Sequence, residues 1–269
     1  AALGAVDFLM WVVTGISTGL TQGFSIQLSQ YYGAKDFENL RKSLAHSYRL
    51  TAFIAAGVLI LSQSFASLVL TGLHTPSNII GMSLLYLRII FCGIPATAAY
   101  NMFASALRAM GNSKTPLTAM IIASVLNVSL DILFVAGFGW GVAGAAIATV
   151  IAQSFSAVYC FLILRRIDIV HLTRADFMPA SGMNVRLMKL GIPVVFQNII
   201  IGVGGLVVQY VINGYGFLFV AGFTATNKLY GLLEMAAISY GYAIVTYVGQ
   251  NLGAGKIDRI RKGVRSSML

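Results

Sequence analysis

The sequence predicts an all-α integral membrane protein, a polytopic helix bundle built as a parallel repeat of two lobes. Charged residues make up only 10% of the chain and hydrophobic residues 58%, with a mean hydropathy of +0.82. Soluble domains carry roughly 25% charged residues, so this composition is that of a membrane protein. Two further observations support the architecture: apolar stretches of membrane-spanning length, and a motif that recurs near the end of the chain.

About seven transmembrane helices are expected in this chain, because a helical bilayer span needs about 20 predominantly apolar residues. Stretches of sufficient length lie near residues 4–30, 46–70, 79–107, 116–138, 141–164, 189–213 and 219–250. We expect the longer ones to tilt or to extend into the cytoplasm.

The connections between these stretches alternate in charge. The segments around 71–76, 137–144 and 213–216 carry no Lys or Arg. Basic loops face the cytoplasm, so we expect a multi-pass membrane protein with residue 1 outside and residue 269 inside. The net charge of +10 then reflects orientation in a lipid bilayer, and we expect no nucleic-acid partner. The basic residues of the other connections and the tail are Lys35, Arg41, Lys42, Arg49, Arg108, Lys114, Arg165, Arg166, Arg174, Arg186, Lys189, Lys256, Arg259, Arg261, Lys262 and Arg265.

A short motif occurs twice with an offset of 220 residues, as QYYGAKDFENLRK from Gln30 and as QNLGAGKIDRIRK from Gln250. Both copies follow an apolar stretch on the cytoplasmic side, and they are six spans apart. An even number of spans keeps the orientation, so the repeat is parallel, about an axis along the membrane normal. The offset predicts six helices per lobe and a longer protein of twelve, of which this chain holds the second to the eighth.

The domain boundaries follow from this repeat. We assign residues 1–164 to an N-terminal lobe without its first helix, 165–188 to a cytoplasmic linker, and 189–269 to the start of a C-terminal lobe. The linker is the longest connection and contains Pro179-Ala-Ser-Gly182, a sequence typical of loops. Its end, Met183–Lys189, is interpreted either as a short amphipathic helix on the membrane surface or as a solvated loop.

The first candidate for chemistry is Asp131, which lies inside an apolar stretch with no basic residue within sixteen positions on either side. A carboxylate in hydrocarbon costs at least a few kcal/mol, so it needs partners or a proton. Asn127 lies one helical turn earlier on the same face, where both side chains could meet one ligand. The alternative is that the two side chains only hydrogen-bond neighbouring helices.

Other polar residues at membrane depth are candidates for a substrate cleft. An ionisable side chain is expected in the protein interior, where structural pairing is the alternative role. In the first stretch the polar residues follow helical spacing, and they either line a cleft or belong to a small-residue helix contact formed by Gly15, Gly19 and Gly23. The candidates are Ser17, Thr21, Gln22, Arg88, Gln197, Asn198, Lys228 and Glu234.

No enzyme site is expected. The three histidines are far apart in the sequence, and no Cys/His cluster or phosphate-binding loop is present. Cys92 and Cys160 both lie in apolar stretches and are interpreted as buried packing residues. We therefore expect no cofactor.

Four segments together resemble the multidrug and toxic compound extrusion (MATE) transporters. They are the paired Gln-x-x-Gly-Ala helix ends, the segment Arg108–Pro116, the Asn127-x-x-x-Asp131 pair and the segment Gly141–Thr149. The resemblance covers the whole chain and implies a monomeric, two-lobed antiporter. Such a protein expels lipophilic, often cationic compounds in exchange for Na⁺ or H⁺ through a cleft that opens alternately to either side. The resemblance also implies residence in the cytoplasmic membrane of a bacterium.

The resemblance also implies a coupling site. Asp131 and Asn127 match the fifth-helix acid and amide of the family's cation site in the N-terminal lobe, and Thr149 matches its sixth-helix hydroxyl. These oxygens suit Na⁺, and a proton on Asp131 is the alternative. Some members carry a Glu on the seventh helix, whereas this chain has Gln197, so we favour the N-terminal lobe.

Two other functions compete with this hypothesis. A flippase for lipid-linked oligosaccharides has a related two-lobed architecture, and a cleft richer in Arg and Lys would favour it. A complete seven-helix receptor is a third possibility, and the repeat argues against it.

Overall fold

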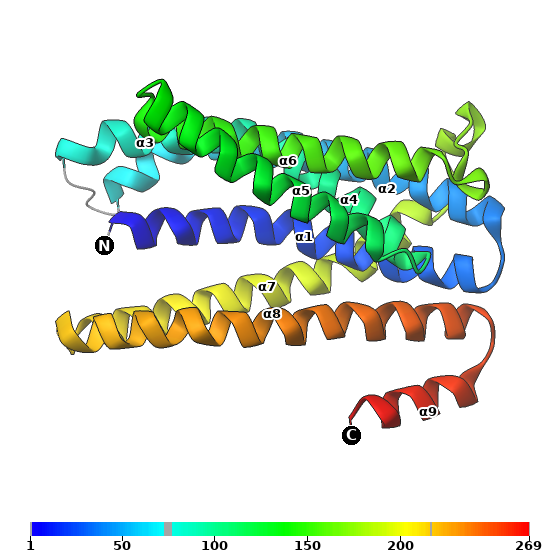
Figure 1. Cartoon of the computed structure of the whole chain (residues 1–269). Helices are drawn as coiled ribbons and strands as arrows, with labels where there is room; N and C mark the ends of the chain where they lie inside the picture. Colours follow the sequence, from blue (N-terminus) through cyan, green and yellow to red (C-terminus); the bar gives the residue numbers. More distant parts are fainter. Residues whose placement is uncertain (1, 73–76, 216, 269) are drawn as a thin grey trace.

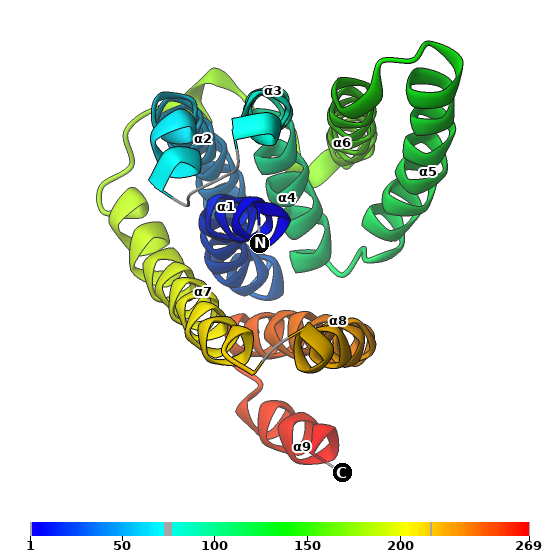
Figure 2. The same ribbon diagram turned by 90° about the vertical axis from the view of Figure 1, so that its left-hand side faces the viewer.

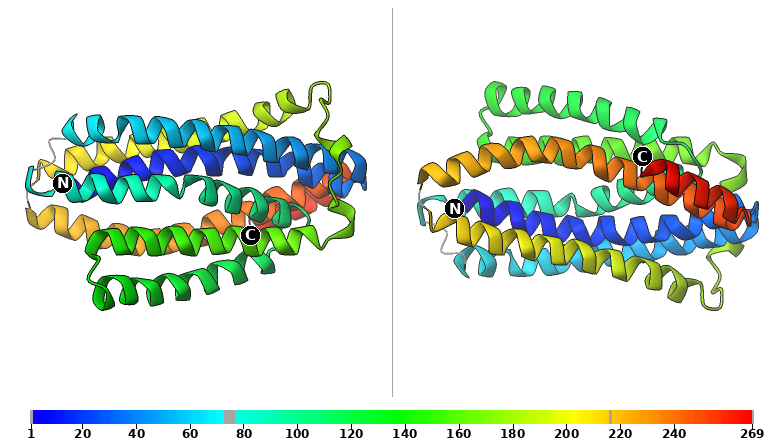
Figure 3. Two further views of the ribbon diagram at one scale, coloured as in Figure 1. Left: turned by 90° about the horizontal axis from the view of Figure 1, so that it is seen from above. Right: turned by 90° about the horizontal axis from the view of Figure 1, so that it is seen from below.

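The computed structural model describes residues 2–72, 77–215 and 217–268. Over these residues all regular structure is helical, and the long helices run side by side in an elongated bundle (Figures 1 and 3). The helices are α1 Ala2–Gly33, α2 Phe37–Gly72, α3 Ser77–Cys92, α4 Ile94–Ala109, α5 Lys114–Asp131, η1 Ile132–Gly137, α6 Gly141–Arg165, η2 Asp168–Val170, η3 Arg174–Phe177, α7 Met183–Asn213, α8 Phe217–Gly253 and α9 Ile257–Ser267.

The all-helical membrane fold predicted from the sequence is confirmed. In the described part of the chain, five helices are long and apolar enough to cross a membrane, and a sixth span results if α3 and α4 form one bent span. Each of the seven expected stretches lies within a helix or helix pair, although α1, over the first of them, is not among these candidates.

The expected single helix over 79–107 is wrong in detail, because it breaks at Gly93 into α3 and α4. The two parts meet at an angle of 41°. Pro95, at the start of α4, has no N–H to donate, and its ring would clash with the carbonyl of Phe91 in a continuous helix. The backbone turns at Gly93, whose N–H donates to the Ile90 carbonyl over 2.8 Å.

The seventh helix begins earlier than expected. Met183–Lys189 is neither a separate surface helix nor a loop, because α7 runs without interruption from Met183 to Asn213. Gly182 precedes it with a φ of 74°, a left-handed conformation that favours glycine and starts the helix here. Pro193 lies inside α7 and does not open it.

The connection between α6 and α7, which the sequence predicts to be a linker between lobes, is folded against α2. The Asp176 carboxylate accepts hydrogen bonds from the Thr173 N–H and hydroxyl, at 2.7 and 2.8 Å, and lies 3.8 Å from the Arg41 guanidinium. The Arg49 guanidinium donates to the Phe177 carbonyl over 2.9 Å. The connection therefore follows the surface of α2, and it is not a free tether.

His46 adds a buried contact at the same place. Its Nδ1 lies 2.7 Å from Asn184 Oδ1, at the start of α7, and its Nε2 lies 3.0 Å from the Met178 carbonyl. One side chain of α2 thus holds both the connection and the first turn of α7.

The repeat predicted from the sequence is visible in the backbone. Helices α1 and α8 end at Gly33 and Gly253, and α2 and α9 begin at Phe37 and Ile257, all with the offset of 220 residues. The turns carry equivalent hydrogen bonds: the Ala34 N–H donates to the Gln30 carbonyl over 2.9 Å, and the Ala254 N–H to the Gln250 carbonyl over 3.0 Å.

The two copies of the motif also contact each other reciprocally. A Cβ atom added to Gly33 would collide with the Gln250 carbonyl, and one added to Gly253 would collide with the Gln30 carbonyl. Since α1 and α8 run in the same direction (Figure 1), this reciprocity places an approximate two-fold axis along the helices.

Helix α1 occupies the centre of the molecule. It packs against α2 and α4 on one side and against α7 and α8 on the other (Figure 2). The α7 contact is close because Gly19 and Gly23 of α1 face the backbone of Val195 and Gly191. The apolar core between α1, α2, α4 and α6 includes Phe24, Leu28, Leu44, Leu107 and Leu164.

Candidate functional site

Asp131 is the last residue of α5, at the point where the α-helix changes into the π-helical segment η1. In this segment the Phe138 N–H donates to the Leu133 carbonyl, five residues back, over 2.9 Å. Short π segments inside α-helices occur frequently at functional sites, because the wider turn alters which carbonyls are paired. The change of helix type thus coincides with the one acidic residue of this stretch.

Asp131 is half-buried, and one of its two carboxylate oxygens lies away from solvent. Its Oδ1 atom is shielded from solvent and has no hydrogen-bond partner among the described residues. A carboxylate oxygen shielded from water without a partner is unfavourable, and a cation or a proton would supply the missing partner. The orphaned oxygen is the structural observation that fits a bound Na⁺ or H⁺ at this position.

Asn127 and Thr149, two of the candidate residues, lie within reach of each other. The Asn127 Nδ2 lies 3.5 Å from the Thr149 Oγ1, which itself donates to the Ala145 carbonyl over 3.0 Å. With the amide nitrogen toward Thr149, the amide oxygen of Asn127 stays available as an acceptor. Asp131 lies one turn further along α5 from Asn127, so the three candidate residues carry carboxylate, amide and hydroxyl oxygens, which are ligands for hard cations.

The turn after η1 sets the spacing between α5 and α6. Gly139 and Gly141 have φ values of 69° and 53°, so the chain reverses within a few residues. The rings of Phe134 and Trp140 stack at a centroid distance of 5.1 Å. Gly144 lies so close to Phe134 that an added Cβ would be 2.9 Å from the Phe134 Cβ. This contact holds the start of α6, and with it Thr149, against the end of α5.

The polar side chains along α1 form hydrogen bonds mainly with the backbone of their own helix. Ser17 and Thr21 are buried, and the Thr21 hydroxyl donates to the carbonyls of Ser17 and Thr18 at 3.0 and 3.1 Å. Gln22 is half-buried. Because the neighbouring glycines face α7, this arrangement favours the helix-contact alternative over a cleft lining.

Among the described side chains, no hydrogen bond or ion pair joins the remaining cleft candidates to Asp131. The Asn198 amide donates to the Gly15 carbonyl over 3.1 Å and joins α7 to α1. Gln197, Arg88 and Glu234 are exposed on the described surface. The side chain of Lys228 lies outside the described side chains.

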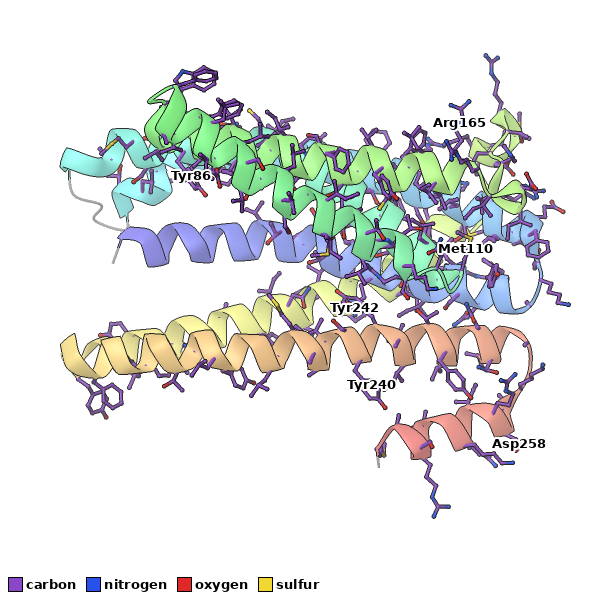
Figure 4. All side chains as sticks on the ribbon, viewed as in Figure 1. Tyr86, Met110, Arg165, Tyr240, Tyr242 and Asp258 are labelled. Carbon is purple, nitrogen blue, oxygen red and sulfur yellow. The ribbon has the colours of Figure 1, made fainter. Side chains whose placement is uncertain are left out.

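Sequence reasoning missed a group of contacts between the two lobes. The Gln250 amide of α8 donates to the Ala109 carbonyl at the end of α4 over 2.8 Å. The Arg108 guanidinium lies 4.9 Å from the centre of the Tyr242 ring, on the side of α8 opposite to Tyr240 and α9 (Figure 4). The repeated Gln250 was a usable signal, but its partner, a backbone carbonyl, leaves no trace in a sequence.

Helix ends that repeat in parallel orientation, and a half-buried carboxylate with one unpartnered oxygen inside an apolar helix, are typical of a class of protein: polytopic membrane proteins with a secondary-transporter architecture. The MatE family model matches residues 1–133 and 193–269, and on this basis the chain belongs to the MatE family. This confirms the resemblance drawn from its motifs. The family is one of transporters and not of enzymes.

Relatives and solved structures agree with this assignment. The chain is 31% identical to "Probable multidrug resistance protein YpnP" of Bacillus subtilis over 96% of its length, and 28% identical to "Probable multidrug resistance protein YoeA" of the same organism over 98%. It spans 59% of the length of each of these two relatives.

The fold is that of solved MATE structures. A structure described as the outward-facing conformation of a multidrug resistance MATE family transporter is 19% identical, with a TM-score of 0.88 over 99% of this chain and 60% of that one. A second structure, described as the inward-facing conformation of a multidrug resistance MATE family transporter, is 21% identical. Its TM-score is 0.77, and the match covers 99% of this chain and 61% of that one.

Proposed function

We propose that the complete protein is a secondary antiporter that exports lipophilic or cationic compounds in exchange for Na⁺ or H⁺. Membership of the MatE family, and relatives named for multidrug resistance and multidrug export, support the substrate class. The single observation that carries the coupling is the orphaned Asp131 Oδ1 atom at the junction of α5 and η1. This chain would supply the coupling site and part of the cleft.

The coupling ion would bind at Asp131, Asn127 and Thr149. It neutralises the carboxylate and removes the energetic penalty of a buried unpaired charge. If the site is well formed in only one conformation, the ion favours that conformation by its differential affinity. The π-helical segment next to Asp131 is the element through which occupancy would change the geometry of α5.

The described conformation would be the one closed toward the cytoplasm. The ends of α1 and α8 at Gly33 and Gly253 are in close contact, and both precede the basic loops that we place in the cytoplasm. We propose that the N-terminal lobe ends near 164 and the C-terminal lobe begins near 189. Separation of the two helix ends would open the cytoplasmic side.

The test uses the complete gene product in inverted membrane vesicles, with transport of a fluorescent lipophilic cation as the readout. Asp131→Asn is compared with wild type under an imposed Na⁺ gradient and, separately, a pH gradient. We expect wild type to respond to one of them and D131N to respond to neither, a loss of at least tenfold.

The matched control is Ser129→Ala on the same helix, where the hydroxyl only donates to the Val125 carbonyl of its own helix. It should transport like wild type. Normal transport by D131N would refute the proposed coupling site. Absence of any drug transport by wild type would overturn the substrate class and raise the flippase alternative.

A further inference from the structure

The N-terminal lobe contains a cavity that the coupling site does not use. It measures about 360 Å³ and lies in the cytoplasmic half of the lobe, between α2, α4 and α6. Its walls are apolar and are formed mainly by alanines and by the rings of Tyr48, Phe103 and Phe161. Thr149 and Asp131, near the outer ends of α6 and α5, do not line it.

The bend at Gly93 explains why the cavity exists. Helix α4 contacts both α2 and α6, and its change of direction by 41° leaves a recess above Pro95 and Ala99. The facing residues of α2 are Ala52, Ala55 and Ala56, too small to fill it. At the cytoplasmic end, Phe103 joins Tyr48 and Phe161 with ring-centroid distances of 5.3 Å to each.

Water is a poor occupant of this cavity. A water molecule needs about 30 Å³ and two to four polar partners. The cavity is large enough for water, but its apolar walls offer too few hydrogen-bond partners. The cavity borders the apolar surface of the lobe, where Phe53 is 70% and Leu162 50% exposed. In a bilayer this surface contacts acyl chains. From Thr51 to Leu59 the cavity extends roughly 12 Å at about 1.5 Å per residue, close to the thickness of one hydrocarbon leaflet, about 15 Å.

The cytoplasmic end of the cavity is basic. Arg49 lies one turn before Ala52 on α2, and Arg165 lies one turn after Phe161 on α6, each on the same helix face as its lining neighbour. Both arginines are exposed, and no described carboxylate forms an ion pair with either. Arg165 lies at the end of α6 where the inter-lobe connection begins (Figure 4).

We propose that this cavity binds one acyl chain of an anionic phospholipid from the cytoplasmic leaflet, with the phosphate at Arg49 and Arg165. The chain fills an apolar recess that water fills poorly, and the headgroup meets two exposed cations at the depth where anionic lipid is found. The site depends on the membrane location of the lobe and is independent of the transported substrate and the coupling ion.

Fluorescence quenching tests the proposal on the complete gene product. A reporter, Phe161→Trp, is placed in the cavity wall after every other tryptophan of the complete gene product, including Trp11 and Trp140, is replaced by Phe. The protein is reconstituted in vesicles of phosphatidylcholine with increasing phosphatidylglycerol brominated in its acyl chains. We expect the quenching of F161W to saturate at a mole fraction of brominated phosphatidylglycerol about fivefold lower than the mole fraction of brominated phosphatidylcholine that gives the same quenching. The R165Q substitution should remove this preference for the anionic lipid.

The matched control is Val158→Trp, on the exposed surface of the same helix and outside the cavity. Its quenching should rise in proportion to brominated lipid of either headgroup. A filling variant, Ala99→Leu, should reduce the quenching of F161W and leave that of V158W unchanged. The proposal is overturned if F161W behaves like V158W, or if F161W is not quenched because another part of the protein covers the cavity.

Discussion

Lys35 adopts a left-handed backbone conformation, with a φ of 58°, in the turn between α1 and α2. The equivalent position of the second copy is Gly255, with a φ of 69°. The two turns have the same shape because the Lys35 N–H donates to the Tyr32 carbonyl over 3.1 Å and the Gly255 N–H to the Leu252 carbonyl over 3.0 Å. A residue with a Cβ is strained here by roughly 1–2 kcal/mol, whereas glycine is not.

Replacement of Lys35 by Gly should therefore stabilise the protein by about 1 kcal/mol, after allowance for the greater entropy of glycine in the unfolded chain. The measurement is thermal unfolding in detergent. Ala34→Gly, one residue earlier and outside the left-handed region, is the control and should destabilise instead. An unfolding temperature for K35G at or below that of wild type would contradict this explanation of the turn.

At the scale of single elements, two helical stretches are interrupted beside the sites proposed above. The break between α3 and α4 produces the apolar cavity, and the change from α5 to η1 occurs at Asp131. The cause of the first break is visible in the sequence, since Gly93 and Pro95 stand in the middle of an apolar stretch. The second is not, because neither glycine nor proline occurs between Pro116 and Gly137.

The connection between the lobes is a second element whose structure depends on a few contacts. Asp176 is buried, although it is acidic and lies in a loop. It caps η3 through Thr173 and pairs with Arg41. Loss of such a cap costs about 1–2 kcal/mol. The contacts of Asp176 with Thr173 and Arg41 therefore stabilise the folded connection against α2.

Asp176→Ala should therefore increase cleavage of the connection by trypsin, after Arg166 or Arg174, by about 5- to 30-fold. The rate of cleavage of folded protein in detergent is the measurement. Asp168→Ala is the control, because this side chain is in the same connection and is fully exposed. Equal cleavage rates for the two variants would show that the contacts of Asp176 do not hold the connection in place.

At the scale of the whole molecule, the two copies of the repeated motif pack against each other. Parallel helices α1 and α8 meet at their ends through Gly33 and Gly253, and Ser29 lies against Gly249. Backbone groups approach this closely only where side chains are absent. The contacts of Gln250 with Ala109 and of Arg108 with Tyr242 join the same ends of the two lobes.

Gly33→Ala and Gly253→Ala should each favour the conformation in which these ends are apart, since either added Cβ collides with a carbonyl of the other helix. A cysteine at Ser29, in a background without Cys92 and Cys160, reports the change through labelling by a membrane-impermeant maleimide. A shift of about 1.4 kcal/mol would raise the labelling rate about tenfold.

Gly57→Ala is the matched control, because a Cβ at this position meets nothing within 4 Å. It should leave the labelling rate unchanged. Unchanged labelling in both G33A and G253A would refute the role of the glycine contact in closing the cytoplasmic side.

Sequence alone determined the helical membrane fold, the repeat and the candidate residues at Asp131 and Asn127. These features are local or periodic: hydrophobic length, the charge of alternating loops, and a carboxylate isolated in an apolar stretch. Each is read from the order of residues along the chain and needs no knowledge of how the helices pack. The family resemblance then added Thr149, 18 residues beyond Asp131 in the sequence.

Tertiary structure decided which side chains meet. The approach of Asn127 to Thr149 depends on the turn at Gly139 and Gly141, and the cavity depends on how the bend at Gly93 directs α4 between α2 and α6. The contact of Gly33 with Gly253 joins residues 220 positions apart. Such distances result from packing between helices, and no single segment of a sequence encodes how two helices approach each other.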